Sequence, residues 1–214
     1  MEIIVIHDFR KDFFMLPSVF INAFMTLTVI VDPVGTAAAF AGRSSGFEIH
    51  QARRIALKSV VIAFTLLLLA GLFGNALLNK IGITFSAFRI AGGILLFATA
   101  SRMIFGCRDQ KLTKENVGMS HDITVFPLAI PLLAGPGCMT AMALLMEKTD
   151  SWQDSMLVIT ALVLTHVTAL ICLIGANYIR KFLGMDGADI VARVMGIILA
   201  AMSVQFIIDG IHGA

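Results

Sequence analysis

The chain has 214 residues, a mass of 23.0 kDa, 58% hydrophobic and 14% charged residues and a mean hydropathy of +0.90. Its net charge of +2 excludes the strongly basic surface of a nucleic-acid-binding protein. The low charge and high apolarity exclude a disordered chain, and windows of about 20 residues with almost no charge exclude a water-soluble domain. We therefore expect an all-α membrane protein, folded as a single transmembrane domain over residues 1–214.

Six apolar stretches are long enough to cross a bilayer as helices. The predicted spans are 16–41, 55–78, 83–106, 123–146, 156–178 and 188–211. The first is interrupted by Asp32-Pro33-Val34-Gly35, and the fourth by Pro127, Pro131 and Gly135-Pro136-Gly137. Helices 1 and 4 are therefore predicted to be broken near the middle of the membrane, because proline disrupts a helix interior.

The distribution of lysine and arginine predicts the orientation, because cytoplasmic loops carry an excess of both. Eleven lie on one side of the predicted spans and five on the other, the five being Arg10, Lys11, Lys80, Arg89 and Lys148. We expect the richer side to be cytoplasmic and both termini to lie outside. Arg89 and Arg193 are expected to reach toward opposite interfaces, and residues 1–14 do not resemble a signal peptide.

The two halves of the chain contain an internal repeat. Matching pairs are separated by 103 or 104 positions: Arg89 with Arg193, Gly92 with Gly196 and Pro33 with Pro136. Each predicted repeat, about 16–106 and 123–211, holds three spans, so the second would be inserted upside down. Inverted repeats with broken helices in matching places are typical of secondary transporters, whose substrate lies between the breaks. A chance likeness between glycine-containing helices is the alternative.

The breaks are the candidate substrate site. Helix N-termini within the membrane suit a carboxylate, and C-termini suit an ammonium group or a cation. A zwitterionic amino acid would need both. The predicted substrate-binding residues are Asp32, Pro33, Gly35, Thr36, Gly135, Pro136, Gly137 and Thr140. The alternative is a pair of packing kinks that bind no ligand.

Asp32 is a carboxylate inside a predicted span, where ionisable groups are usually functional. It could cap the following half-helix, bind a substrate ammonium group or carry a proton. The hydroxyls of Thr36 and Thr140 could face a cavity or bond back to a carbonyl one turn earlier. His166, the mid-span histidine, could relay protons with Asp32 or hydrogen-bond between helices.

No residue pattern indicates a metal ion, a cofactor or a catalytic centre. Cys107, Cys138 and Cys172 are scattered without the spacing of a zinc site or a disulfide framework. The sequence contains no nucleophile elbow, P-loop or HExxH motif. We therefore do not expect an enzyme, and chemistry by His166 and Asp32 is the weakest alternative.

The sequence resembles a known family over nearly its whole length, from about Phe20 to Gly210. The likeness is carried by Val31-Asp32-Pro33-Val34-Gly35, by Phe88-Arg89-Ile90-Ala91-Gly92-Gly93-Ile94-Leu95, by Pro127-Leu128-Ala129-Ile130-Pro131-Leu132-Leu133-Ala134-Gly135-Pro136-Gly137 and by Arg193-Val194-Met195-Gly196. These stretches are similar to the MarC family of bacterial inner-membrane proteins. A related group, the SnatA-like proteins, transports small neutral amino acids such as glycine and alanine.

The resemblance implies six spans in an inverted repeat, in the inner membrane, with the substrate near the broken helices. Its (Asn/Asp)-Pro-x-Gly motif corresponds to Asp32, Pro33 and Gly35, and its Gly-Pro-Gly motif to Gly135, Pro136 and Gly137. The chain departs from the family in two places. Cys138 stands where alanine is frequent, and Ala38 stands where many members have proline.

These features predict a secondary transporter of small neutral amino acids or similar metabolites, working by alternating access. Its expected partners are the lipid bilayer, a small zwitterionic substrate and a coupling ion, either H⁺ or Na⁺. A homo-oligomer through the Gly92-Gly93 face is not distinguished from packing within one chain. The alternatives are a passive channel, a non-transporting membrane protein of this family and, from the family name alone, drug efflux.

Overall fold

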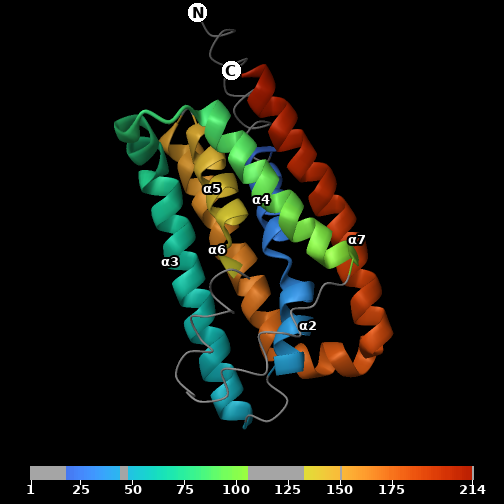
Figure 1. Ribbon diagram of the computed structural model, residues 1–214. Helices are drawn as coiled ribbons and strands as arrows, with labels where there is room; N and C mark the ends of the chain where they lie inside the picture. The colour runs from blue at the N-terminus through green and yellow to red at the C-terminus, as the bar shows by residue number, and fades with distance from the viewer. Residues whose placement is uncertain (1–17, 44–47, 106–132, 150, 214) are drawn as a thin grey trace, which may run out of the picture.

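The computed structural model describes residues 18–43, 48–105, 133–149 and 151–213 (Figure 1). Residues 18–31 are helical. They are followed by α2 (Pro33–Arg43), α3 (Ile49–Ile81), α4 (Phe85–Phe105), α5 (Pro136–Glu147), α6 (Trp152–Ile174) and α7 (Ala176–His212). The predicted all-helical class is confirmed for this part of the chain.

Five helical segments are long and apolar enough to cross a membrane, counting only the described residues. They are Ser18–Ala37, Ile49–Ile81, Phe85–Phe105, Trp152–Ile174 and Ile190–His212. The first ten residues of the predicted fourth span, with Pro127 and Pro131, lie outside the described residues. The helix α5 supplies the remainder of that span.

Two helices are longer than the sequence predicts. At 1.5 Å per residue, the 33 residues of α3 span about 50 Å, well beyond the hydrocarbon thickness of about 30 Å. Its first turns carry charged residues that the predicted span 55–78 left out, and it ends at Gly82, whose φ of 80° is left-handed. The helix α7 has 37 residues, and its first part lies across the lower end of the molecule before the chain turns upward (Figure 1).

The predicted fifth span, 156–178, is displaced toward the C-terminus relative to α6. The helix starts earlier because Ser151 caps it: the Ser151 hydroxyl accepts from the Asp154 N–H at 3.2 Å and donates to the Asp154 carboxylate at 2.9 Å. It ends at Ile174, before Gly175. Hydropathy did not locate the start of this helix, because a polar capping side chain sets it.

The helices pack in a definite set of pairs. The most extensive contact is between α4 and α7, and the other main pairs are α3 with α5, α2 with α7, α2 with α6, α3 with α6 and α4 with α5. The core is built from many alanines together with larger side chains that are almost fully buried, such as Leu27, Leu67, Met142, Leu162 and Leu173. Small residues let helices approach closely where lipid offers no hydrophobic driving force.

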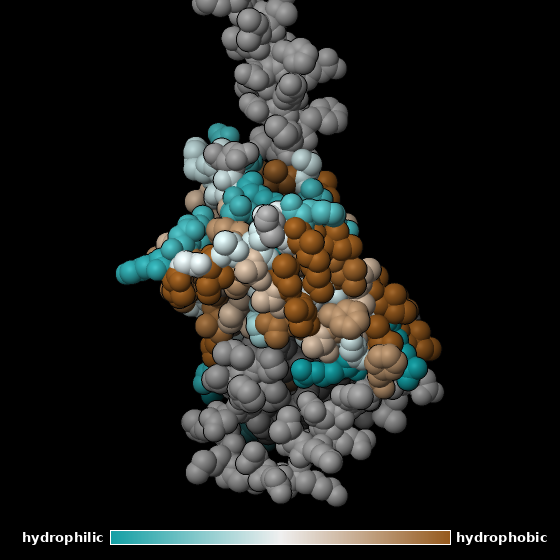
Figure 2. All heavy atoms as spheres, turned by 45° about the horizontal axis from the view of Figure 1, so that its top comes forward, coloured by the Kyte–Doolittle hydropathy of each residue, from teal (hydrophilic) through white to brown (hydrophobic). Residues whose placement is uncertain are grey.

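Large hydrophobic side chains cover the outside of the bundle. On α3, Leu72, Phe73 and Leu77 are about half exposed, and Ile94 of α4 and Ile197 of α7 are similarly open. Figure 2 shows hydrophobic side chains gathered in a band across one face, with hydrophilic side chains above it. Such a surface would favour aggregation in water. In a bilayer it is the surface that contacts lipid tails, as expected for an integral membrane protein.

Candidate functional site

Asp32 separates the helical residues 18–31 from α2 and has a positive φ of 45°. Its carboxylate oxygen Oδ1 accepts a hydrogen bond from the Gly35 N–H at 3.1 Å, so Asp32 caps the N-terminus of α2. A Cβ atom on Gly35 would overlap the Asp32 carboxylate. Aspartate tolerates the left-handed region better than most residues, and glycine at position 35 leaves room for its side chain.

The capping arrangement takes the Gly35 N–H away from its usual helical acceptor, the Val31 carbonyl, because that N–H bonds to Asp32. Two side chains donate to carbonyls at this end of the preceding helix. The Thr36 hydroxyl donates to the Val31 carbonyl at 3.1 Å, and the Cys138 thiol donates to the Ile30 carbonyl at 3.8 Å. Thr36 therefore bonds to backbone, one of the two alternatives that the sequence left open.

The helix α5 starts at Pro136, with Gly135 as its N-cap residue and no side-chain capping hydrogen bond. The Thr140 hydroxyl donates to the Pro136 carbonyl at 3.0 Å, so it also bonds back to the helix. A Cβ atom on Gly137 would collide with the Leu96 side chain. Gly137 thus allows α4 to lie close against the first turn of α5.

The Cys138–Ile30 hydrogen bond joins the first turn of α5 to the end of the helix that precedes Asp32. The structure therefore brings the two predicted break regions together, although more than 100 residues separate them. The junction is buried: Asp32 is 7% exposed, Thr36 4%, Cys138 4% and Thr140 3%. Two helix N-termini, those of α2 and α5, start at this place inside the bundle (Figure 1).

His166 lies on α6 and is almost fully buried. Its Nδ1 is 2.9 Å from the Leu162 carbonyl, which can only accept, so Nδ1 carries a proton. Its ring meets Phe64 of α3 edge to face, with centroids 5.6 Å apart. Within the described part of the chain, Nε2 has no hydrogen-bond partner and no hydrogen bond joins His166 to Asp32. A proton relay between them would need an intervening group.

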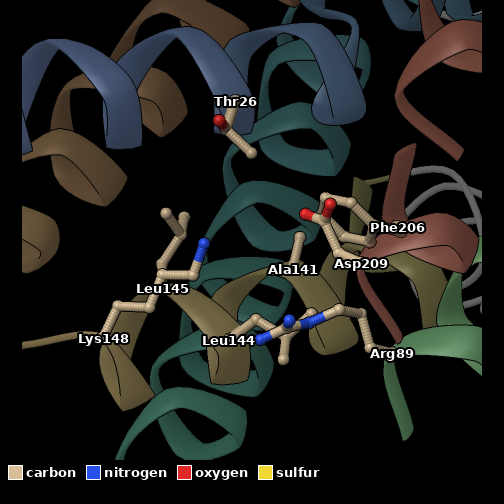
Figure 3. Close-up of a pocket in the computed structure, with 8 residues that line it drawn as sticks. All are labelled: Thr26, Arg89, Ala141, Leu144, Leu145, Lys148, Phe206 and Asp209. Atoms are coloured by element: carbon tan, nitrogen blue, oxygen red, sulfur yellow. The ribbon is translucent and has the colours of Figure 1, made fainter. Parts of the chain in front are cut away.

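A pocket of about 90 Å³ lies between the helical residues 18–31, α4, α5 and α7 (Figure 3). It is lined by Thr26, Arg89, Ala141, Leu144, Leu145, Lys148, Phe206 and Asp209. Arg89, which the sequence predicts to reach toward the interface, has an acidic partner at the end of α5. Its guanidinium lies 3.8 Å from the Glu147 carboxylate, and its side chain is only 18% exposed, whereas Arg193 is exposed. Arg89 and Glu147 are far apart in the sequence, so their ion pair forms only because α4 packs against α5.

No group of three His, Cys, Asp or Glu side chains could hold a metal ion among the residues that the structure describes. Cys138 and Cys172 are free thiols. Cys107, like the rest of residues 106–132, lies outside the described residues.

Two features of the structure are not predicted by the sequence. Cys138 departs from the family pattern, but its contact with Ile30 depends on how the helices pack. Asp209 stood within a predicted apolar span, in Phe206-Ile207-Ile208-Asp209, and that carboxylate was the available signal for the pocket.

Comparison with known proteins identifies the family of this chain. The model of the MarC family of integral membrane proteins matches residues 17–214. A UPF0056 membrane protein of Methanocaldococcus jannaschii is 35% identical over 198 residues, covering 91% of this chain and 97% of the relative. A second, from Archaeoglobus fulgidus, is 34% identical over 197 residues, covering 91% and 92%. A third, from Aquifex aeolicus, is 33% identical over 201 residues, covering 90% and 92%.

No solved structure matches the chain. The relatives come from archaea as well as bacteria, and their names describe them as membrane proteins. The family match covers nearly the whole chain and agrees with the apolar helices and the lipid-facing surface. The chain is therefore a multi-pass integral membrane protein that belongs to the MarC family.

Proposed function

We propose that this protein is a secondary transporter of small neutral amino acids, with its central site at the junction of α2 and α5. The observation that carries the proposal is the buried meeting of two helix N-termini beside Asp32, joined by the Cys138–Ile30 contact. Backbone groups that leave regular helix inside a membrane are costly unless they line protein or a polar cavity. Such interruptions are typical of substrate sites in transporters.

The pattern of helix packing supports an inverted repeat. Suppose that residues 18–43, α3 and α4 form one repeat, and that α5, α6 and α7 form the other. Exchanging the repeats turns the α3–α5 pair into α6–α2 and the α4–α5 pair into α7–α2, while α4–α7 and α3–α6 exchange with themselves. These are the six main pairs that pack. A chance likeness between helices would not predict this agreement.

Close contacts between α4 and α7 support the same symmetry and refine its register. A Cβ atom on Gly93 would lie 2.8 Å from the Ser203 carbonyl, and one on Gly196 would lie 3.2 Å from the Ala100 carbonyl. Gly93 and Gly196 are 103 positions apart, and so are Ala100 and Ser203, so the two contacts are equivalent in the two repeats. The same offset relates Pro33 to Pro136. We therefore align Gly93, rather than Gly92, with Gly196.

The junction offers complementary groups for a zwitterion. The N-terminus of α5 carries partial positive charge and lacks a side-chain cap, so it suits a substrate carboxylate. At α2 the Asp32 carboxylate already caps the helix through Oδ1. Its second oxygen suits a substrate ammonium group. Asp32 is also the candidate for binding a coupling proton.

The test is counterflow of labelled glycine, alanine, serine and threonine in proteoliposomes. Asp32→Asn is the informative variant, because asparagine caps helices as well as aspartate does and removes only the charge. We expect saturable counterflow in the unmodified protein and its loss in Asp32→Asn. The matched control is Asp154→Asn at the α6 cap, which should transport normally. Gly137→Val is a poor probe, since it would clash with Leu96.

The alternatives give other results. A passive channel predicts flux that neither saturates nor exchanges. A non-transporting protein predicts no flux with any of these substrates in a folded, inserted sample, and that result would overturn the proposal. Transport that Asp32→Asn leaves intact, at every pH, would remove Asp32 from both substrate and proton binding.

A further inference from the structure

We propose that the pocket between Arg89 and Asp209 is a second zwitterion site, where a small amino acid binds before it reaches the α2–α5 junction. This inference rests on the proposed function. Figure 3 shows the charged ends of Arg89, Lys148 and Asp209 around one space. The three come from α4, from the residue after α5 and from α7, so only the packed bundle brings them together.

The charged groups suit the two ends of an amino acid. The Arg89 guanidinium has five N–H donors in a planar fork that matches a carboxylate. Its contact with Glu147, at 3.8 Å, is longer than a hydrogen bond, so it leaves donors for a ligand. On the opposite side, Gln205 donates to Asp209 Oδ1 at 2.6 Å and holds that carboxylate in place. The other oxygen, Oδ2, suits an ammonium group.

The rest of the lining limits the side chain of the ligand. Ala141, Leu144, Leu145 and Phe206 make one part of the wall apolar, and Thr26 adds a hydroxyl. A volume of about 90 Å³ is well below the roughly 300–1,000 Å³ of pockets that hold drug-sized ligands. Glycine or alanine fits this description better than a large or charged amino acid.

Two residues that line the pocket, Thr26 and Ala141, lie within about two helical turns of the junction. Thr26 precedes Asp32 by six residues, about 9 Å along a helix, and Ala141 follows Pro136 by five. Arg89 is near the start of α4 and Asp209 near the end of α7, so the pocket is near the C-terminal end of the bundle. At the offset of 103, Asp209 corresponds to Gly106, whereas Arg193 lies next to Ala192, the counterpart of Arg89. The Arg89–Asp209 pair therefore has no complete equivalent in the other repeat.

The test measures binding and transport separately. Binding of glycine, methylamine and acetate is measured by titration calorimetry in phosphatidylglycerol nanodiscs, which contain no zwitterionic headgroup. Arg89→Gln should weaken glycine and acetate by about tenfold or more, as expected when a charge-assisted hydrogen bond is lost. Asp209→Asn should weaken glycine and methylamine. Arg102→Gln, at the exposed far end of α4, is the matched control and should change nothing.

Glu147→Gln separates a binding role from a structural one. It removes the ion-pair partner of Arg89 but leaves the guanidinium in the pocket. We expect it to keep glycine binding. Equal losses in Glu147→Gln and Arg89→Gln would show that the ion pair only holds the helices, and would overturn the inference. Recovery of acetate binding in Arg89→Lys, which restores the charge, would support it.

Counterflow distinguishes this inference from the proposed function. Saturable counterflow with an unchanged KM in both pocket variants would overturn the second site and leave the transporter standing. Glycine binding that depends on Arg89, without any counterflow, would support the pocket and overturn transport. The absence of both binding and counterflow in the unmodified protein would overturn both.

Discussion

At the scale of single residues, Asp32 and Gly35 act as one unit. The carboxylate that caps α2 occupies the space where a Cβ atom on residue 35 would lie. A substitution at either position therefore changes what the other can do, and their effects on stability should be coupled.

We expect Gly35→Ala to lower the free energy of unfolding by about 1–3 kcal/mol, because it displaces the Asp32 carboxylate. Asp32→Ala should cost about 1 kcal/mol through loss of the cap. The double variant should cost less than the sum, since the collision is then absent. Reversible unfolding in mixed micelles measures all three. Gly71→Ala is the control, because the atom nearest to its added Cβ is the flexible end of the Met142 side chain. Additive effects would contradict the coupling.

At the scale of helices, the α4–α7 pair depends on close backbone approach. A Cβ atom on Gly93 or Gly196 would press on a carbonyl of the facing helix. We expect either alanine substitution to lower the melting temperature. The double variant should fall by less than the sum, because one separation of the helices relieves both contacts.

Thermal unfolding of the purified protein measures these effects. Ala98→Val is the control, because it adds more volume on an exposed part of α4 and should leave the melting temperature unchanged. An equal fall of the melting temperature in Ala98→Val would mean that larger side chains destabilise α4 at any position, and not only where it contacts α7.

The lengths of the helices show what a sequence can and cannot predict. Apolar runs located α4 to within two residues, because lipid requires a continuous apolar surface over that length. They did not predict the charged first turns of α3, which stay helical because backbone hydrogen bonding continues outside the hydrocarbon region. The Asp32 cap was one of the local alternatives, since it needs only residues three positions apart. The Arg89–Glu147 pair depends on how α4 and α5 rotate against each other, and no local pattern encodes that.

At the scale of the whole molecule, the orientation in the membrane remains a prediction from the distribution of lysine and arginine. In a Gram-negative host, alkaline phosphatase fused after residue 214 should be active, because we expect the C-terminus outside. The same enzyme inserted near residue 115 should be inactive. A fluorescent protein, which matures only in the cytoplasm, should give the opposite pattern. Active phosphatase at residue 115 would reverse the orientation and place the Arg89–Asp209 pocket on the cytoplasmic face.

The glycines of this bundle also differ in whether a second substitution could compensate for a larger residue in their place. A Cβ atom on Gly71 would meet the side chains of Met142 and Met146, and a smaller residue there could restore the fit. Atoms near Gly93 and Gly210 include the carbonyls of Ser203 and Ser86, which no change of side chain can remove. A selection for second-site suppressors should therefore yield compensating changes for an enlarged residue 71. For residues 93 and 210 it should return mainly true revertants.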